Sequence, residues 1–131
     1  MADIPMRQSG TVTGNITSTE GSYYEEEIGT ININNAFRTI YRRIIYCGNF
    51  SGTKTVSTSI PITKQILSVS GVMRQNNNSG AVYPIPYVTY NTPATNLVGL
   101  NLNNDGTNYT AVMFNNDGLT KYNCYITVEY C

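Results

Sequence analysis

Short runs of β-branched and aromatic residues, separated by turn-forming residues, recur along the chain from residue 28 onward. Ile, Val, Thr and Tyr dominate these runs, and clusters of Gly, Asn, Pro and Ser interrupt them about every ten residues. No helical stripe with capping residues occurs, so we predict an all-β fold with almost no helix. The predicted strands are residues 28–33, 37–46, 54–58, 65–74, 82–89, 97–102, 109–114 and 122–130.

The segment 122–130 alternates most strictly between apolar and polar side chains. One face of this predicted strand carries Cys124, Ile126, Val128 and Tyr130. A period of two is what a half-buried strand requires, since successive side chains point to opposite faces of a sheet. We therefore predict that Cys124 is a core residue rather than a reactive thiol.

The tetrapeptide Asn-Asn-Asp-Gly occurs at residues 103–106 and again at 115–118. Asp-Gly tolerates the positive φ of a tight hairpin turn, so we predict that the last three strands form an antiparallel meander. The complete pattern predicts an antiparallel β-sandwich of about eight strands with a jelly-roll-like arrangement.

Charge divides the chain near residue 28. Residues 1–27 hold five carboxylates and one Arg, whereas residues 28–131 hold seven Lys or Arg and three carboxylates. Because the first segment lacks hydrophobic periodicity, we predict an extended N-terminal arm at 1–27 and a sandwich domain at 28–131. The arm is either a solvated linker or a docking segment. The candidate docking residues are Tyr23, Tyr24, Glu25, Glu26 and Glu27.

Composition disfavours several classes of partner. Charged residues make up 12% of the chain and the formal net charge is zero, so we expect no nucleic-acid partner. No run of residues is apolar and long enough for a membrane span, and the polar N-terminus does not resemble a signal peptide. We expect synthesis in a reducing cytoplasm, with the three cysteines as free thiols.

The residue types for catalysis are scarce. The chain has no histidine, and the predicted sandwich domain offers three carboxylates, so no acid–base pair is evident. Residues 101–106 match the first half of a calcium loop, but Val112 stands where the bidentate Glu belongs. We predict a non-enzymatic protein without catalytic residues, metal or cofactor.

Tyrosine is abundant, with 11 Tyr and no Trp. Its ring and hydroxyl suit both sugar stacking and protein interfaces. Tyr83, Tyr87 and Tyr90 surround two prolines and are the candidate glycan or interface contacts. The alternative is that most tyrosines lie half-buried on sheet surfaces.

Several short motifs follow one another along the chain. They are Gly29, the segment 41–48, a Thr/Ser-rich strand at 53–59, the segments 66–72 and 84–88, and a final strand at 126–130. In this order they resemble a domain common in tail and fibre proteins of bacteriophages. The chain departs from that pattern at Ile31 and Asn34-Asn35, and at Ser59–Pro61, where the family usually has a His.

The resemblance implies a β-sandwich, frequently trimeric, at the end of a fibre or as a knob on the virion. Open sheet edges with few charges also favour self-association. We therefore expect a non-enzymatic virion structural protein made in the bacterial cytoplasm, a homotrimeric tail-fibre tip, head fibre or capsid decoration. Its arm would contact other virion proteins, and its loops would bind a host receptor glycan. The alternative is a soluble bacterial carbohydrate-binding module or lectin.

Overall fold

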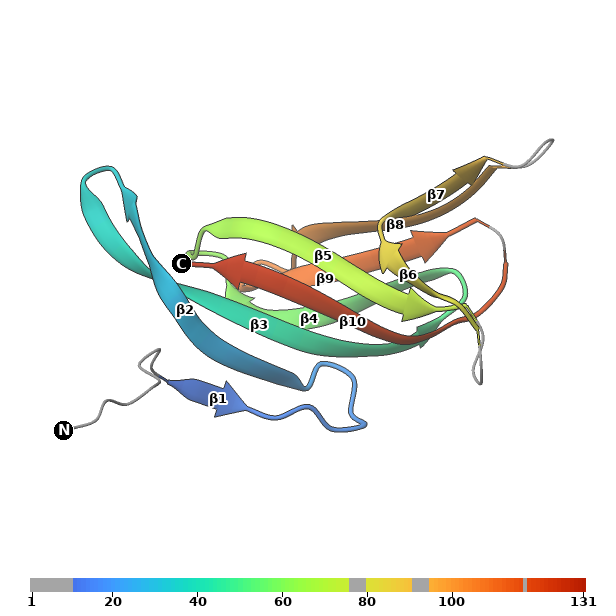
Figure 1. Cartoon of the computed structure of the whole chain (residues 1–131), viewed down its shortest axis with the longest axis horizontal. Coiled ribbons are helices and arrows are strands. Elements are labelled where there is room, and N and C mark those ends of the chain that lie inside the picture. The colour runs from blue at the N-terminus through green and yellow to red at the C-terminus, as the bar shows by residue number, and fades with distance from the viewer. Residues whose placement is uncertain (1–10, 76–79, 91–94, 117) are drawn as a thin grey trace.

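A computed structural model describes residues 11–75, 80–90, 95–116 and 118–131 (Figure 1). These residues form ten strands and no helix. The strands make two antiparallel sheets that pack face to face, with apolar side chains between them. The predicted all-β sandwich is therefore confirmed.

The larger sheet has six strands in the order β1-β2-β3-β10-β5-β6. Strand β10 lies at its centre and pairs with β3 on one side and β5 on the other. The bounds are β1 Val12–Gly14, β2 Tyr23–Ile33, β3 Ala36–Phe50, β10 Lys121–Tyr130, β5 Ile66–Arg74 and β6 Val82–Ile85.

The smaller sheet has four strands in the order β4-β9-β8-β7. Strands β7, β8 and β9 follow one another as antiparallel neighbours, and β4 lies beside β9 at the other edge of the sheet. The bounds are β4 Thr53–Pro61, β9 Asn108–Asn115, β8 Thr95–Asn104 and β7 Tyr87–Tyr90.

The core lies between the two sheets and follows the predicted alternation. Cys124, Ile126 and Val128 of β10 are fully buried, so the prediction for this strand is confirmed. Strand β3 adds core side chains from the same sheet, and β4 and β9 supply the side chains that face them from the smaller sheet. The principal ones are Ile45, Cys47, Val56, Ile60, Ala111 and Met113.

The predicted boundary at residue 28 is wrong, because strand β2 begins at Tyr23. Residues 23–27, expected in the arm, pair with residues 41–45 of β3. Glu25 is buried, with 8% of its surface exposed, and it faces a buried Arg43. An acidic run in sequence therefore becomes part of the sheet, since its central charge is neutralised inside the fold.

The predicted C-terminal meander is correct for one hairpin only. Asn-Asn-Asp-Gly at 103–106 does join β8 to β9. After the second tetrapeptide the chain leaves the smaller sheet, because β10 pairs with β3 and β5 instead of β9. The apolar row of β10 is buried more fully at the centre of the larger sheet than an edge position would allow.

The predicted strand 82–89 is two strands, β6 and β7, which belong to different sheets. They divide at Pro86, which has no N–H to donate to a ladder. The chain thus changes layer at this proline.

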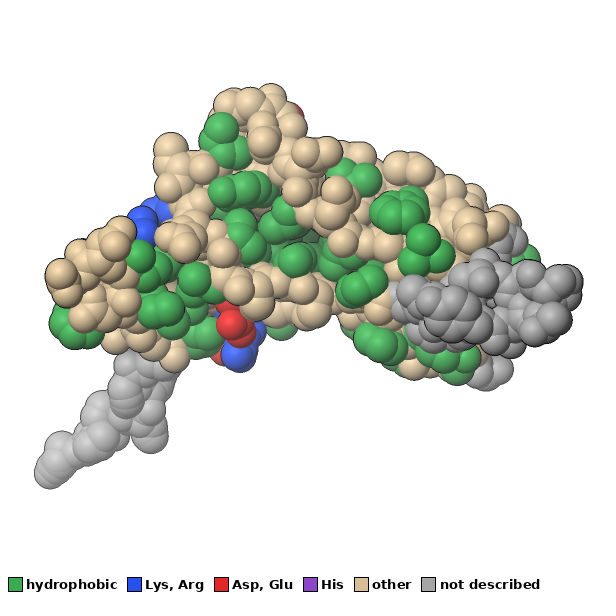
Figure 2. Space-filling view, turned by 90° about the horizontal axis from the view of Figure 1, so that it is seen from above, with side chains coloured by type: hydrophobic (Ala, Val, Ile, Leu, Met, Phe, Trp, Pro, Cys, Tyr) green, Lys and Arg blue, Asp and Glu red, His purple; other side chains and the backbone are tan. Residues whose placement is uncertain are grey.

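The hairpin of β2 and β3 extends beyond its neighbouring strands (Figure 1, upper left). Strand β10 stops pairing with β3 at Tyr41, and Thr11 makes the last described contact along the outer edge of β2, at Glu27. Asn34 and Asn35 turn the hairpin with φ of 53° and 63°, which Asn tolerates better than most residues. Figure 2 shows hydrophobic side chains at the surface of this end of the molecule.

Candidate functional site

The acidic segment expected to dock onto a partner is engaged within the chain. Glu25 Oε1 accepts a hydrogen bond from Arg43 Nε at 2.9 Å and another from the Tyr130 hydroxyl at 2.7 Å. Arg43 Nη1 donates to the carbonyl of Thr58 at 2.8 Å, which connects the larger sheet to β4 of the smaller sheet. This cluster therefore joins the two layers.

Aromatic rings complete the cluster. The guanidinium carbon of Arg43 lies 3.7 Å from the ring centroid of Tyr23, and the rings of Tyr41 and Tyr130 stack at 5.4 Å. Burial, followed by the hydrogen bond to Glu25, raises the pKa of Tyr130 well above its usual range. The neutral phenol is therefore favoured as a donor to the carboxylate.

The other docking candidates lie on the outer face of the larger sheet. The Tyr24 hydroxyl donates to Glu26 Oε2 at 3.2 Å. Arg42 Nε lies 3.0 Å from Glu129 Oε2, and its Nη1 lies 3.9 Å from Glu26 Oε1. The structure thus splits the five docking candidates, with Tyr23 and Glu25 directed inward and Tyr24 and Glu26 outward, while Glu27 is half-buried.

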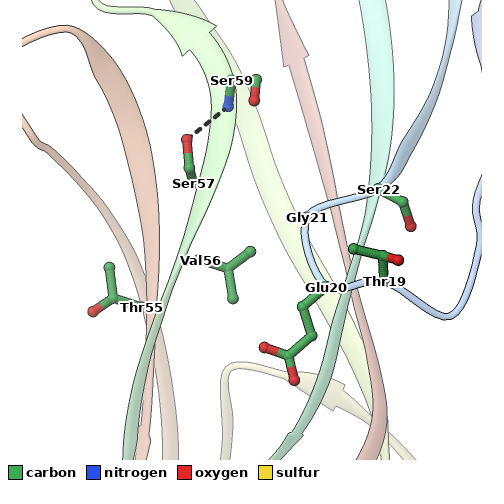
Figure 3. A pocket seen from close by; sticks show the side chains of 8 residues that line it. All are labelled: Thr19, Glu20, Gly21, Ser22, Thr55, Val56, Ser57 and Ser59. Carbon is green, nitrogen blue, oxygen red and sulfur yellow. Dashed lines mark hydrogen bonds between the residues drawn. The ribbon is translucent and has the colours of Figure 1, made fainter.

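A polar groove lies between β4 and the loop before β2 (Figure 3). Its volume is about 510 Å³, and the Ser59 N–H donates to Ser57 Oγ at 3.2 Å along one wall. Glu20 contacts Lys54, so the carboxylate in the groove is paired. The lining residues are Thr19, Glu20, Gly21, Ser22, Thr55, Val56, Ser57 and Ser59.

The lining of this groove consists mainly of groups that can form hydrogen bonds. One paired carboxylate supplies no second acid or base, and the lining contains no aromatic ring for a sugar to stack on. Among the described residues, no three His, Cys, Asp or Glu side chains gather as metal ligands.

The three predicted contact tyrosines lie on two strands that belong to different sheets. Tyr83 lies on β6 of the larger sheet and packs, partly buried, against the core. Tyr87 and Tyr90 belong to β7 of the smaller sheet, and their side chains lie outside the described residues. Their role as glycan contacts stays a prediction.

A second recess, on the outer face of the larger sheet, was missed by the sequence analysis. It has a volume of about 250 Å³ and lies where β5, β6 and β10 run side by side. The ring of Tyr125 lies 5.3 Å from that of Tyr46, and Val82 is 56% exposed. Its lining residues are Val72, Met73, Arg74, Val82, Asn123 and Tyr125.

The register explains this recess. Tyr125 faces Tyr46 on one neighbouring strand and Val72 on the other, and Val72 faces Pro84. Alternation along 122–130 places Tyr125 on the outer face, but only the pairing shows which apolar residues join it. This surface is built by β3, β10 and the consecutive strands β5 and β6.

The two central thiols are not nucleophiles in this fold. Burial raises the pKa of Cys47 and that of Cys124 to about 12, and the neighbouring Cys124 adds to the shift of Cys47. Both are protonated at neutral pH, and a thiol attacks only as a thiolate. Asp105 has a lowered pKa because the N–H groups of Asn108 and Thr107 donate to its carboxylate within the hairpin turn.

Comparison with known proteins finds no matching family model, no matching curated sequence and no matching solved structure. Among the described residues, none forms a helix with the length and hydropathy of a membrane span. The geometry above therefore defines three candidate surfaces, which are the protruding hairpin, the outer recess and the polar groove.

Proposed function

We propose that this protein is a non-enzymatic structural module of a bacteriophage particle, a β-sandwich knob that assembles into a homotrimer. The observation that carries the assembly part of this proposal is the hairpin of β2 and β3, which extends beyond the sandwich with Phe37 77% exposed. An oligomer gives this segment a partner, whereas a monomer leaves it in water.

Physical chemistry supports a partner for the hairpin. A lone two-stranded hairpin is marginally stable in water, and an open strand edge is a template for another chain. Beyond Glu27 on β2 and before Tyr41 on β3, the two strands pair with each other, and no third strand among the described residues pairs with either of them. Phe37, Ile31 and Ile33 also leave apolar surface at least partly exposed there. Association would cover both the edges and the side chains.

The non-enzymatic part of the proposal is supported by the described carboxylates. Glu25 is held by Arg43, Glu26 and Glu129 by Arg42, and Glu20 by Lys54. Asp105 accepts backbone N–H groups in a turn. These interactions leave little free acid–base capacity near any described groove.

The phage setting rests on the sequence resemblance, and the β-sandwich is the fold that this resemblance implies. Because residues 23–27 belong to β2, we propose that the attachment to other virion proteins uses the part of the predicted arm before Tyr23, of which Val12–Gly14 forms the edge strand β1. The proposal covers a tail-fibre tip, a head fibre and a capsid decoration alike.

Light scattering coupled to size exclusion tests the assembly. The full chain at micromolar concentration should elute with a mass near three times 14.5 kDa. A mass of 14.5 kDa that does not change on concentration would contradict the oligomer, and a stable dimer would contradict the threefold arrangement.

The polar groove favours a second candidate, a carbohydrate-binding module that uses serine and threonine hydroxyls. A glycan array tests it directly. Binding that is lost in Thr55→Leu and retained in Phe37→Asp would assign the groove to a saccharide. Absence of binding on the array would contradict this second candidate and leave assembly as the one proposed function.

A further inference from the structure

We propose that Phe37 of one copy inserts into the outer recess of the next copy, formed by Val72, Val82 and Tyr125. The inference rests on the proposed oligomer and assigns its contact surface. In this contact, the word knob refers to the hairpin tip that carries Phe37 and no longer to the whole sandwich. The word hole refers to the recess on β5, β6 and β10. Every copy carries both.

The knob is a bulky ring held at the end of a projecting element. Phe37 is 77% exposed, the highest value among the large apolar residues described, and it pairs with Asn32 across the hairpin. Strand β3 begins at Ala36, five residues before Tyr41, and five residues of extended chain span about 17 Å. That reach lets the ring contact a neighbouring molecule without the two sandwiches overlapping.

The hole has the size and chemistry for one side chain. Its volume of about 250 Å³ lies below the roughly 300–1,000 Å³ of typical small-molecule sites, so it suits a single ring. Val72, Val82 and Tyr125 give it apolar walls, and the contact with Tyr46 supports the ring of Tyr125. Arg74 also lines it and supplies a cation for the face of an aromatic ring.

A second copy is the occupant that the geometry favours. The hairpin tip and β6 lie far apart along the long axis of the molecule in Figure 1, so the ring cannot enter the recess of its own chain. The recess is lined by one cation and no carboxylate, and the hairpin tip carries one cation, Arg38, and no carboxylate beyond Glu27. The contact therefore depends on apolar fit rather than on charge pairing.

Such a contact is head-to-tail, because the surface used on one copy differs from the surface used on the next. Repeated contacts of this type form a closed ring if the rotation closes and a filament if it does not. A single discrete mass in solution identifies the ring.

The experiment uses two full-length variants with opposite defects. Phe37→Asp removes the knob and keeps the hole, whereas Val82→Asp removes the hole and keeps the knob. Each variant alone should be monomeric, since losing the burial of one large apolar side chain weakens association about 10- to 100-fold per contact. Both residues are exposed, so thermal melting should match the wild type. Leu119→Asp, at a residue 62% exposed, is the control and should remain oligomeric.

Mixing the two variants gives the sharpest result. The knob of Val82→Asp fits the hole of Phe37→Asp, so a heterodimer should form at about 100 µM in sedimentation velocity and grow no further. No heterodimer, or loss of assembly in one variant alone, overturns the contact. If both variants keep the wild-type mass, the contact is wrong and the proposed oligomer stands. A monomeric wild type overturns the oligomer itself.

Discussion

Replacing Glu25 by glutamine removes a buried charge without changing the shape of the side chain. In the native protein this carboxylate accepts hydrogen bonds from Arg43 Nε at 2.9 Å and from the Tyr130 hydroxyl at 2.7 Å. The Arg43 side chain is 8% exposed, so in the variant its positive charge stays inside the sandwich without a counterion. Breaking a buried ion pair by removing one partner costs about 3–5 kcal/mol.

The protein contains a matched exposed pair. Arg42 and Glu129 are also 3.0 Å apart on neighbouring strands, but their side chains are 41% and 29% exposed. An ion pair in this exposed environment contributes about 0.2–1 kcal/mol to the free energy of unfolding. Glu129→Gln and Glu25→Gln therefore make the same chemical change and differ mainly in burial.

Thermal unfolding followed by circular dichroism compares the two variants. For a domain of this size, 1 kcal/mol corresponds to about 3–5 °C in Tm. Glu25→Gln should lower Tm by about 10–20 °C, and Glu129→Gln by less than about 5 °C. Equal shifts in the two variants would refute the claim that Glu25 is a buried structural charge.

Other predictions follow from the thiols and from the start of the sheet. Cys47 and Cys124 should resist a thiol reagent at pH 7.5 in the native protein and react at once in denaturant; fast native labelling would contradict their burial. Because their folded pKa of about 12 exceeds the unfolded value, folding stability should be complete below about pH 9 and fall above it, by about 1.4 kcal/mol per pH unit for each thiol. Urea titrations from pH 7 to 10.5 measure this fall, and a flat profile would refute it. A chain starting at Tyr23 should melt cooperatively, whereas one starting at Glu27 should lose most of its stability because it lacks Tyr23 and Glu25; equal melting of the two would contradict the assignment of residues 23–26 to the fold.

The sequence predicted the fold correctly where the residues of one strand or turn are enough to specify its structure. The row Cys124, Ile126 and Val128 specifies a buried face through alternation alone, and Asp-Gly at 105–106 specifies a hairpin through its φ preference. Pro86 marks a change of sheet that was missed, because a proline at a strand end has the same local sequence pattern whichever sheet follows.

The interaction surfaces were less predictable because they depend on pairing between distant residues. Glu25 resembles a solvated charge until the register places it beside Arg43 and Tyr130, which are 18 and 105 positions away in sequence. The outer recess needs Val72, Val82 and Tyr125 from three strands. Spacing within one segment contains no information about such neighbours.

The central claim is that this chain is a structural component of a phage particle. Quantitative mass spectrometry of gradient-purified phage particles, from the source whose genome encodes the chain, tests it most directly. We expect peptides from across residues 11–131 to copurify with capsid or tail proteins, at a copy number divisible by three. Particles that lack the chain, with the protein found only in the soluble lysate, would contradict the account.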